Sequence, residues 1–231
     1  MDLTVAVIAK ECLPGRVKTR MAPPLTPAGA AELAQLSLTR TLDTVRSLPA
    51  SHRLLVMEGT PRSQDARGFS VTEQAGGTLD ERLAVICDIA VGPLLILGMD
   101  TPQFSDLHLA GLLTDWSSPA PEHDAWLGPA ADGGFWALAL LRPRGSLIRG
   151  VPMSTDRTAA WQLARLSRYR LSTGLLPVLR DMDYFTDALE IAARIPNTDF
   201  AAGVSTASTE IGSAQLQTQP SPEPHRTGGH G

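Results

Sequence analysis

The sequence predicts an α/β protein, a three-layer α/β/α sandwich in which helices cover both faces of a mostly parallel β-sheet. The first observation is that short apolar runs of strand length alternate along the chain with segments of helical periodicity. The second is size, because 231 residues, 43% of them hydrophobic, suffice for one sizeable core. Alternating units of this length are typical of parallel sheets covered on both sides. In such sheets, ligands bind beyond the carboxyl ends of the strands.

The first half of the chain supplies three strands and two helices. Residues 3–9 form a continuous apolar run and predict a strand. Residues 27–47 predict a helix, because Thr26 can cap its N-terminus and Pro27 suits its first turn. The apolar residues of this helix fall on one face: Ala31, Ala34, Leu38, Leu42 and Val45. Strands are expected at 53–57 and, with a weaker pattern, at 68–72. A second helix is expected at 78–90, with Leu79, Leu83 and Ile86 facing inward.

The second half continues the alternation. Residues 93–98 are a short apolar run and predict a strand, which the helix expected at 105–116 follows. Strands at 125–127 and 135–141 flank a PAADGG turn, and helices are expected at 157–167 and, after an acidic turn, at 184–194. These elements predict one domain over residues 1–202. From 203 to 231 the chain is rich in Ser, Thr, Gln, Pro and Gly, and its few large apolar residues cannot offset the entropy of ordering, so a disordered tail is expected there.

Composition excludes several classes of protein. A net charge of −4 and a pI near 5.7 argue against a general nucleic-acid binder, but leave room for a local nucleotide site. No apolar run approaches the length of a transmembrane helix, and the acidic, weakly apolar start predicts a cytoplasmic protein without a secretory leader. The two cysteines, Cys12 and Cys87, are expected to be reduced. Cys12 lies in a basic loop, where it is read as a small filler residue rather than a reactive thiol.

A cluster of cations follows the first strand. Lys10, Arg16, Lys18 and Arg20 lie in a Pro/Gly loop that contains a single acid, Glu11. A strand that leads into a glycine-containing basic loop and then a capped helix is a favourable arrangement for binding phosphate, because backbone N–H groups can approach the anion and the cations neutralise it. The alternative is an ordinary solvated loop. The position directly after a strand favours phosphate binding.

Acidic residues follow later strands. Asp100 stands where the strand at 93–98 should end, so its carboxylate could hold a divalent cation; it could instead cap the next helix. Asp132 precedes two glycines, which suits either an ordinary turn or close approach to a ligand. Asp181, Asp183 and Asp187 crowd together near residue 184. A metal ion would relieve their repulsion, and Asp183 is the residue assigned to it, whereas Asp187 suits the N-terminus of a helix.

A weaker candidate, for binding a nucleobase, lies before the helix expected at 78–90. Gln74 is followed by Gly76 and Gly77, and its amide could supply both a donor and an acceptor to a nucleobase edge. A simple glycine turn explains the same residues equally well.

Five segments taken in order resemble the DUF2064 family, also described as CofC-like or rSAM/selenodomain-associated transferases. They are AKECLPGRVKTRM, GGTLDERL, LLILGMDTP, GPAADGGFWAL and RDMDYFTD, and the resemblance covers roughly Leu3 to Arg194. That family is part of the nucleotide-diphospho-sugar transferase (GT-A) superfamily. The resemblance implies a Rossmann-like sandwich that binds a nucleotide over the first loop, with Mg²⁺ or Mn²⁺ as cofactor.

The resemblance also implies roles for individual residues. Lys18 and Arg20 would hold phosphates, and Asp132 would orient the acceptor or, alternatively, act as a base. Asp100 and Asp183 would be the metal ligands. The remaining nucleotide-binding candidates are Lys10, Gly15, Arg16, Thr19, Gln74, Gly76, Gly133 and Gly134. One departure stands out, because relatives usually have glycine where this chain has Asp80, which adds a charge near the nucleotide.

The leading functional hypothesis is nucleotidyl transfer from a nucleoside triphosphate to a small phosphorylated or hydroxyl acceptor, with loss of pyrophosphate. The first alternative is a glycosyltransferase that uses a nucleotide-sugar donor. The second is a nucleotide-binding protein without turnover.

Overall fold

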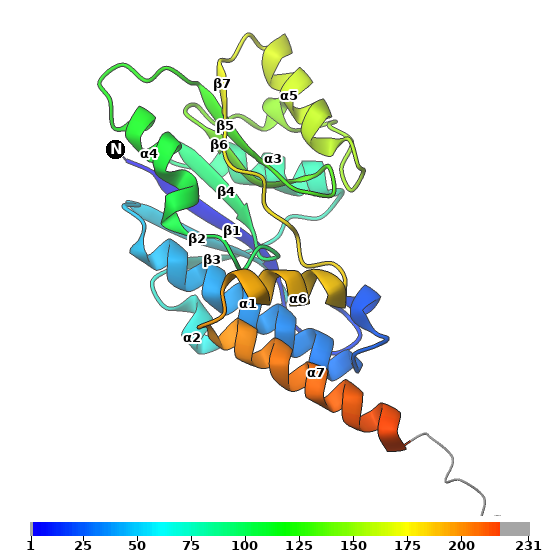
Figure 1. The fold of residues 1–231 in the computed structure, drawn as a ribbon. Coiled ribbons are helices and arrows are strands. Elements are labelled where there is room, and N and C mark those ends of the chain that lie inside the picture. The colour runs from blue at the N-terminus through cyan, green and yellow to red at the C-terminus, as the bar shows by residue number, and fades with distance from the viewer. Residues whose placement is uncertain (1, 218–231) are drawn as a thin grey trace, which may run out of the picture.

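One seven-stranded sheet organises the molecule, in the order β3-β2-β1-β4-β6-β5-β7 (Figure 1). The structure is a computed structural model that describes residues 2–217. The strands are β1 (Thr4–Lys10), β2 (His52–Glu58), β3 (Ser70–Glu73), β4 (Leu94–Gly98), β5 (Ala125–Pro129), β6 (Phe135–Leu140) and β7 (Thr173–Leu175). Six of the strand ranges expected from sequence are therefore confirmed, to within a few residues.

The sheet is mostly parallel, as predicted. β3, β2, β1 and β4 pair in parallel, and β5 pairs in parallel with β7. Only β6 runs the other way, antiparallel to both β4 and β5. Because β6 is reversed, the turn that precedes it lies at the same edge as the carboxyl ends of β1 and β4. This topology brings the basic loop, Asp100 and Asp132 to one edge of the sheet.

Helices cover both faces and complete the three layers (Figure 1). The helices are α1 (Pro27–Ser47), α2 (Ser63–Ala66), α3 (Leu79–Ile89), α4 (Ala110–Trp116), α5 (Thr158–Arg168), α6 (Phe185–Arg194) and α7 (Asp199–Gln217), with 3₁₀ turns at Thr19–Met21, Asp106–Leu109 and Gly145–Leu147. One apolar core joins α1 and α4 to the sheet, and a second joins α3 and α5 to the opposite face. A third core joins α6 and α7 to α1.

Local sequence accounts for the two helices nearest the site. Thr26 caps α1, its hydroxyl accepting a hydrogen bond from the Gly29 N–H at 3.1 Å, and Pro27 occupies the first turn, as expected. A capping box between Thr78 and Glu81 fixes the start of α3. Leu83 and Ile86 of α3 are buried as predicted, but Leu79 is 37% exposed, because it lies in the first turn beside a cavity.

The prediction of a disordered tail is wrong for residues 203–217. These residues continue α7, which begins at Asp199 and packs against α1 and α6. Phe200, Val204 and Ala207 recur at helical spacing and are nearly fully buried, so a few apolar residues on one face are enough to hold this polar segment. Residues 218–231 of the predicted tail lie outside the described part of the chain. Within residues 2–217, no helix is long and apolar enough to cross a membrane.

Candidate functional site

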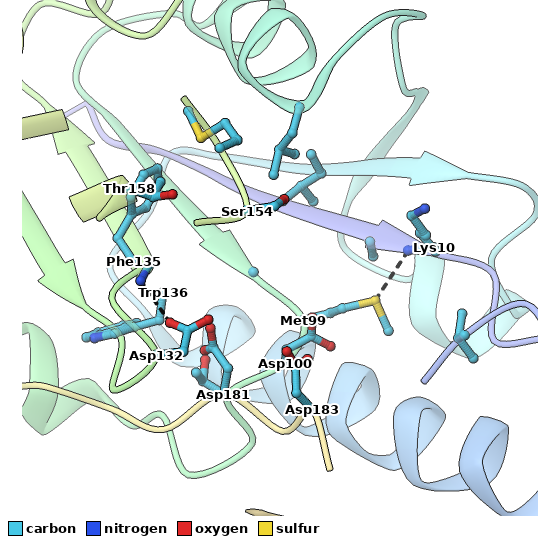
Figure 2. A pocket seen from close by; sticks show the side chains of 18 of the residues that line it. Lys10, Met99, Asp100, Asp132, Phe135, Trp136, Ser154, Thr158, Asp181 and Asp183 are labelled. Atoms are coloured by element: carbon cyan, nitrogen blue, oxygen red, sulfur yellow. Dashed lines mark hydrogen bonds between the residues drawn. The ribbon is translucent and has the colours of Figure 1, made fainter. Parts of the chain in front are cut away.

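A cavity of about 620 Å³ opens at the carboxyl edge of the sheet (Figure 2). Its lining comes from every segment that the sequence singled out. Ten of the thirteen predicted site residues line it: Lys10, Arg16, Lys18, Thr19, Arg20, Gln74, Asp100, Asp132, Gly134 and Asp183. The other three, Gly15, Gly76 and Gly133, are not part of the lining.

The basic loop folds back toward the sheet before α1 begins. Gly15 has φ +74°, a conformation that suits glycine, and the Arg16 N–H donates to the Leu13 carbonyl at 3.0 Å, which closes a tight turn. Lys18 also adopts a left-handed backbone, with φ +46°. Gly15 therefore shapes the turn while its neighbours Arg16 and Lys18 line the cavity.

Lys18 joins the basic loop to the acids. Its ammonium lies 2.9 Å from Asp100 Oδ1 and 3.1 Å from Asp183 Oδ1, and its side chain is only 9% exposed. Burial acts to lower the pKa of Lys18, but the two carboxylates raise it above its usual value. Arg20 reaches Asp183 from the solvent side, at 3.4 Å. Three charged residues that lie more than 80 positions apart in the sequence therefore form one ion-pair cluster.

Hydrogen bonds to the main chain hold the segments that carry these carboxylates. The carbonyl next to Asp100, that of Met99, accepts a hydrogen bond from the Ser37 hydroxyl at 2.6 Å, and the Asp100 carbonyl accepts one from the Met182 N–H at 2.9 Å. This second bond ties the end of β4 to the segment that carries Asp183. Asp187 does not face the cavity; it accepts from the N–H groups of Asp183 and Tyr184 and fixes the start of α6, as its sequence position suggested.

The turn before β6 supplies a further carboxylate. Asp132 Oδ1 accepts a hydrogen bond from the Gly134 N–H at 2.8 Å, which orients the side chain along the cavity wall. Gly133 has φ +90°, and a Cβ there would lie 1.9 Å from the Asp156 carbonyl oxygen. Gly133 is therefore required for the turn to pack against the loop before α5, rather than for direct contact with a ligand.

Asp181 is a site residue that the sequence did not assign. Figure 2 shows its carboxyl group directed toward that of Asp132. Burial, followed by the nearby charges of Asp100 and Asp132, raises the pKa of Asp181 to about 7. The crowding of acids near residue 184 was visible in the sequence, but the burial of Asp181 depends on the tertiary packing.

The amide of Gln74 is mostly engaged within the protein. Its nitrogen donates to the Ala9 carbonyl at 2.6 Å, and its oxygen accepts from Arg82 at 3.2 Å. Arg82 also donates a hydrogen bond to the Glu58 carboxylate at 3.1 Å, and Glu58 forms an ion pair with Lys10 at 3.1 Å. Gln74 therefore positions Arg82 at the cavity wall and has little hydrogen-bonding capacity left for a nucleobase.

Asp80, the departure from the family pattern, has a structural role. Its carboxylate accepts from the Thr78 hydroxyl at 2.6 Å and from the Gly150 N–H at 2.7 Å. The hydrogen bonds from Thr78 and Gly150 lower the pKa of Asp80. This contact ties α3 to the loop that follows Gly150, and together they border a second cavity of about 740 Å³ that adjoins the first.

The acidic side chains of the cavity determine whether it could hold a metal ion. Within residues 2–217, no three His, Cys, Asp or Glu side chains form a ready-made metal site. Asp100 and Asp183 nevertheless converge on a single cation, the Lys18 ammonium, and two carboxylates completed by phosphate oxygens are a usual Mg²⁺ environment. The residues thus fit a divalent cation that a polyphosphate helps to hold.

Burial raises the pKa of Cys12 to about 12, consistent with a filler role.

Comparison with solved structures supports the fold assignment. The protein resembles a Desulfovibrio desulfuricans G20 protein, named provisionally as a nucleotide-diphospho-sugar transferase, with a TM-score of 0.80 and 19% identity over 92% of this chain and 97% of that one. It also resembles CMP:2-keto-3-deoxy-manno-octonic acid synthetase complexed with CTP, with a TM-score of 0.55 and 9% identity over 85% and 99% of the two chains. A cytidylyltransferase from Leptospira borgpetersenii gives a TM-score of 0.51 and 12% identity over 96% and 100%. At these identities the likeness shows the fold, which is of the GT-A type.

Sequence comparison identifies the family. No curated protein matches the chain. Residues 41–155 match the model of a family described as uncharacterized protein conserved in bacteria, DUF2064. This match agrees with the resemblance found in the sequence motifs and with the fold. Over residues 41–155, the chain therefore belongs to the DUF2064 family.

Proposed function

We propose that the protein is a divalent-cation-dependent nucleotidyltransferase, which transfers a nucleoside monophosphate from a nucleoside triphosphate to a small acceptor. One observation carries the proposal. The cations of the loop after β1 and the acids that follow β4 and precede α6 meet in one cavity, joined through Lys18. A bound polyphosphate needs both groups, since the cations contact its oxygens and the acids hold its metal ion.

The phosphate-binding residues come from the basic loop. Arg16, Lys18 and Arg20 would contact phosphate oxygens, with Thr19 beside them and Lys10 at the end of β1. Charge-assisted hydrogen bonds to phosphate are the strong ones, and four cations on one wall suit the charge of a triphosphate. Lys18 is the central residue, because it lies within reach of both the cavity and the two carboxylates.

Asp100 and Asp183 would hold the divalent cation, Mg²⁺ or Mn²⁺. When bound, such an ion neutralises charge on the phosphates and helps to align them. The protein residues position the groups around it. The Asp100 carbonyl is bonded to the Met182 N–H, and the Asp183 N–H is bonded to the Asp187 carboxylate, so the main chain that carries the two metal-binding carboxylates is held in position.

The acceptor would approach from the side of Asp132. An acceptor oxygen forms a bond to the α-phosphorus, and the bond from that phosphorus to the oxygen bridging to the β-phosphate breaks. Pyrophosphate leaves with the electron pair of the broken bond, and the acceptor proton passes to the Asp132 carboxylate. Asp132 has one oxygen held by the Gly134 N–H and is exposed to the cavity, which suits a group that orients the acceptor and takes its proton.

The comparisons favour two readings of the transferred group. The names of two similar structures, a synthetase complexed with CTP and a cytidylyltransferase, support nucleotidyl transfer. The provisional name of the structure with a TM-score of 0.80 favours a glycosyltransferase that uses a nucleotide-diphospho-sugar, and the same cavity could bind such a donor. Our choice between them rests on the basic loop, whose Lys-Thr-Arg sequence resembles that of nucleotidyltransferases.

Ligand binding followed by product analysis tests the proposal. Thermal shifts are first measured with nucleoside triphosphates and nucleotide-sugars, with and without Mg²⁺. We expect a triphosphate to stabilise the protein in the presence of Mg²⁺, and Arg16→Ala to weaken this effect by about tenfold in apparent affinity. A matched control is Arg67→Ala, an arginine outside the cavity lining.

The released product then decides the reaction. Release of pyrophosphate from a nucleoside triphosphate would support nucleotidyl transfer. Release of a nucleoside diphosphate from a nucleotide-sugar would instead show that the protein is a glycosyltransferase. Binding without any product across a broad acceptor panel would indicate a binding protein without turnover. Equal nucleotide affinity in Arg16→Ala and the native protein would remove the basic loop from the site.

A further inference from the structure

The cavity is divided by charge. Every lysine or arginine in its lining comes from residues before 83: Lys10, Arg16, Lys18, Arg20 and Arg82. Every aspartate in its lining comes from residues after 99: Asp100, Asp132, Asp156, Asp181 and Asp183. The split follows the sheet, since the end of β1, the loop after it and the start of α3 carry the cations, while the segment after β4, the turn before β6 and the loops before α5 and α6 carry the acids.

Lys18 and the proposed metal account for only part of the acidic wall. Lys18 pairs with Asp100 and Asp183, the two residues that would hold the metal ion. Asp132, Asp156 and Asp181 form the remainder, which we call the acidic end. Among the residues that the structure describes, no lysine or arginine side chain from β6, the α5 loop or the α6 loop lines the cavity there.

The N-terminus of α5, which could otherwise attract a phosphate, is closed. The N–H groups of Thr158 and Ala159 donate to the carbonyls of Thr155 and Gly133, at 3.2 and 2.9 Å. The Arg157 N–H donates to the Thr155 hydroxyl at 3.2 Å. Helix N-termini bind anions through free N–H groups, and these three successive amides are already bonded within the protein.

Apolar side chains also line the cavity. Phe135 and Met153 are half-buried and line the cavity, and Figure 2 shows Phe135 on the same side as Asp132. Carboxylates accept hydrogen bonds from hydroxyl groups, while an aromatic ring and a thioether pack against C–H faces. Such a combination suits a molecule with several hydroxyl groups and no negative charge.

We infer that the acceptor is an unphosphorylated, uncharged polyhydroxyl compound, whose hydroxyl groups bind the acidic end. This inference rests on the proposed function and selects one of its two acceptor classes. A phosphate monoester placed there would lie beside the carboxylates of Asp132 and Asp156 with no lysine or arginine of the lining next to it, and like charges repel. The reacting nucleophile is accordingly a hydroxyl oxygen, whose proton passes to Asp132 as the bond to phosphorus forms.

The test uses matched pairs of acceptors. The full-length protein, loaded with a non-hydrolysable nucleoside triphosphate analogue and Mg²⁺, is titrated with glycerol, glucose and myo-inositol and with the phosphate monoester of each. We expect at least one unphosphorylated compound to bind, and each monoester to bind about tenfold more weakly than its partner. The double variant Asp132→Asn/Asp156→Asn should reduce this preference, whereas Glu32→Gln, an exposed acid of α1 outside the cavity, should leave it unchanged.

The outcomes separate this inference from the proposed function. Tighter binding of any monoester than of its partner would overturn the inference, and so would the absence of binding by all the unphosphorylated compounds. In both cases a bound nucleotide analogue would leave the proposed function standing. Failure of the analogue itself to bind would overturn both.

Discussion

Replacing Lys18 with methionine should destabilise the protein through the two carboxylates that it leaves behind. Breaking a buried ion pair by removing one partner costs about 3–5 kcal/mol. Lys18 is 9% exposed, but Asp100 and Asp183 are 39% and 37% exposed, so water can rehydrate them in part. We therefore expect a loss of about 2 kcal/mol, which for a chain of this length lowers Tm by about 4–8 °C.

Urea unfolding followed by circular dichroism, in EDTA, measures this loss. The matched control is Lys10→Met, because the Lys10 side chain is 50% exposed and its pair with Glu58 should contribute about 0.5 kcal/mol. Equal stability of the two variants would refute the reasoning, since it would mean that Lys18 is not the cation that holds the acids together. Addition of Mg²⁺ should restore part of the loss in Lys18→Met and none of it in Lys18→Met/Asp183→Asn.

Three further predictions concern the surroundings of the site. Because the pKa of Asp181 is raised from 3.8 to about 7, the folded protein keeps a proton that the unfolded chain releases, so stability should fall as pH rises from about 4 to 7. The Asp181→Asn variant should lack this decline, which is about 4 kcal/mol at 1.36 kcal/mol per pKa unit, and parallel pH–stability curves of the variant and the native protein in EDTA would contradict the prediction. Gly133→Ala, which forces a Cβ against the Asp156 carbonyl, should cost about 3 kcal/mol in urea unfolding; a native-like midpoint would show that the loop yields easily. Cys87 is buried and its burial raises the pKa of its thiol to about 12, so iodoacetamide at pH 8 should label Cys87 only as the protein unfolds, and rapid labelling of Cys87 in the native protein would contradict this.

The sequence predicted the parts of the site that depend on strand ends. Arg16 and Lys18 follow β1 and Asp100 follows β4, and parallel neighbouring strands must end at one edge of the sheet. The reversal of β6 was not predicted, yet Asp132 reaches the same edge because it precedes its strand instead of following it. Alternation of strand and helix therefore carries most of the information about where these residues meet.

Other features could not be predicted from local pattern. The burial of Asp181 and the engagement of the Gln74 amide depend on contacts between segments far apart in sequence. Asp80 looked like an added charge beside the nucleotide, but its partner, the Gly150 N–H, lies 70 positions away. The helix α7 was missed because its composition is polar, although the spacing of Phe200 and Val204 was a signal that could have been read.

Cations and acids should meet around one bound polyphosphate, and a crystal structure of the protein soaked with a nucleoside triphosphate analogue and Mn²⁺ tests this directly. We predict an anomalous difference peak between Asp100 and Asp183, with the phosphates against Arg16 and a displaced Lys18 ammonium. Phosphates bound away from the loop that follows β1, or manganese bound only outside this cavity, would contradict the account.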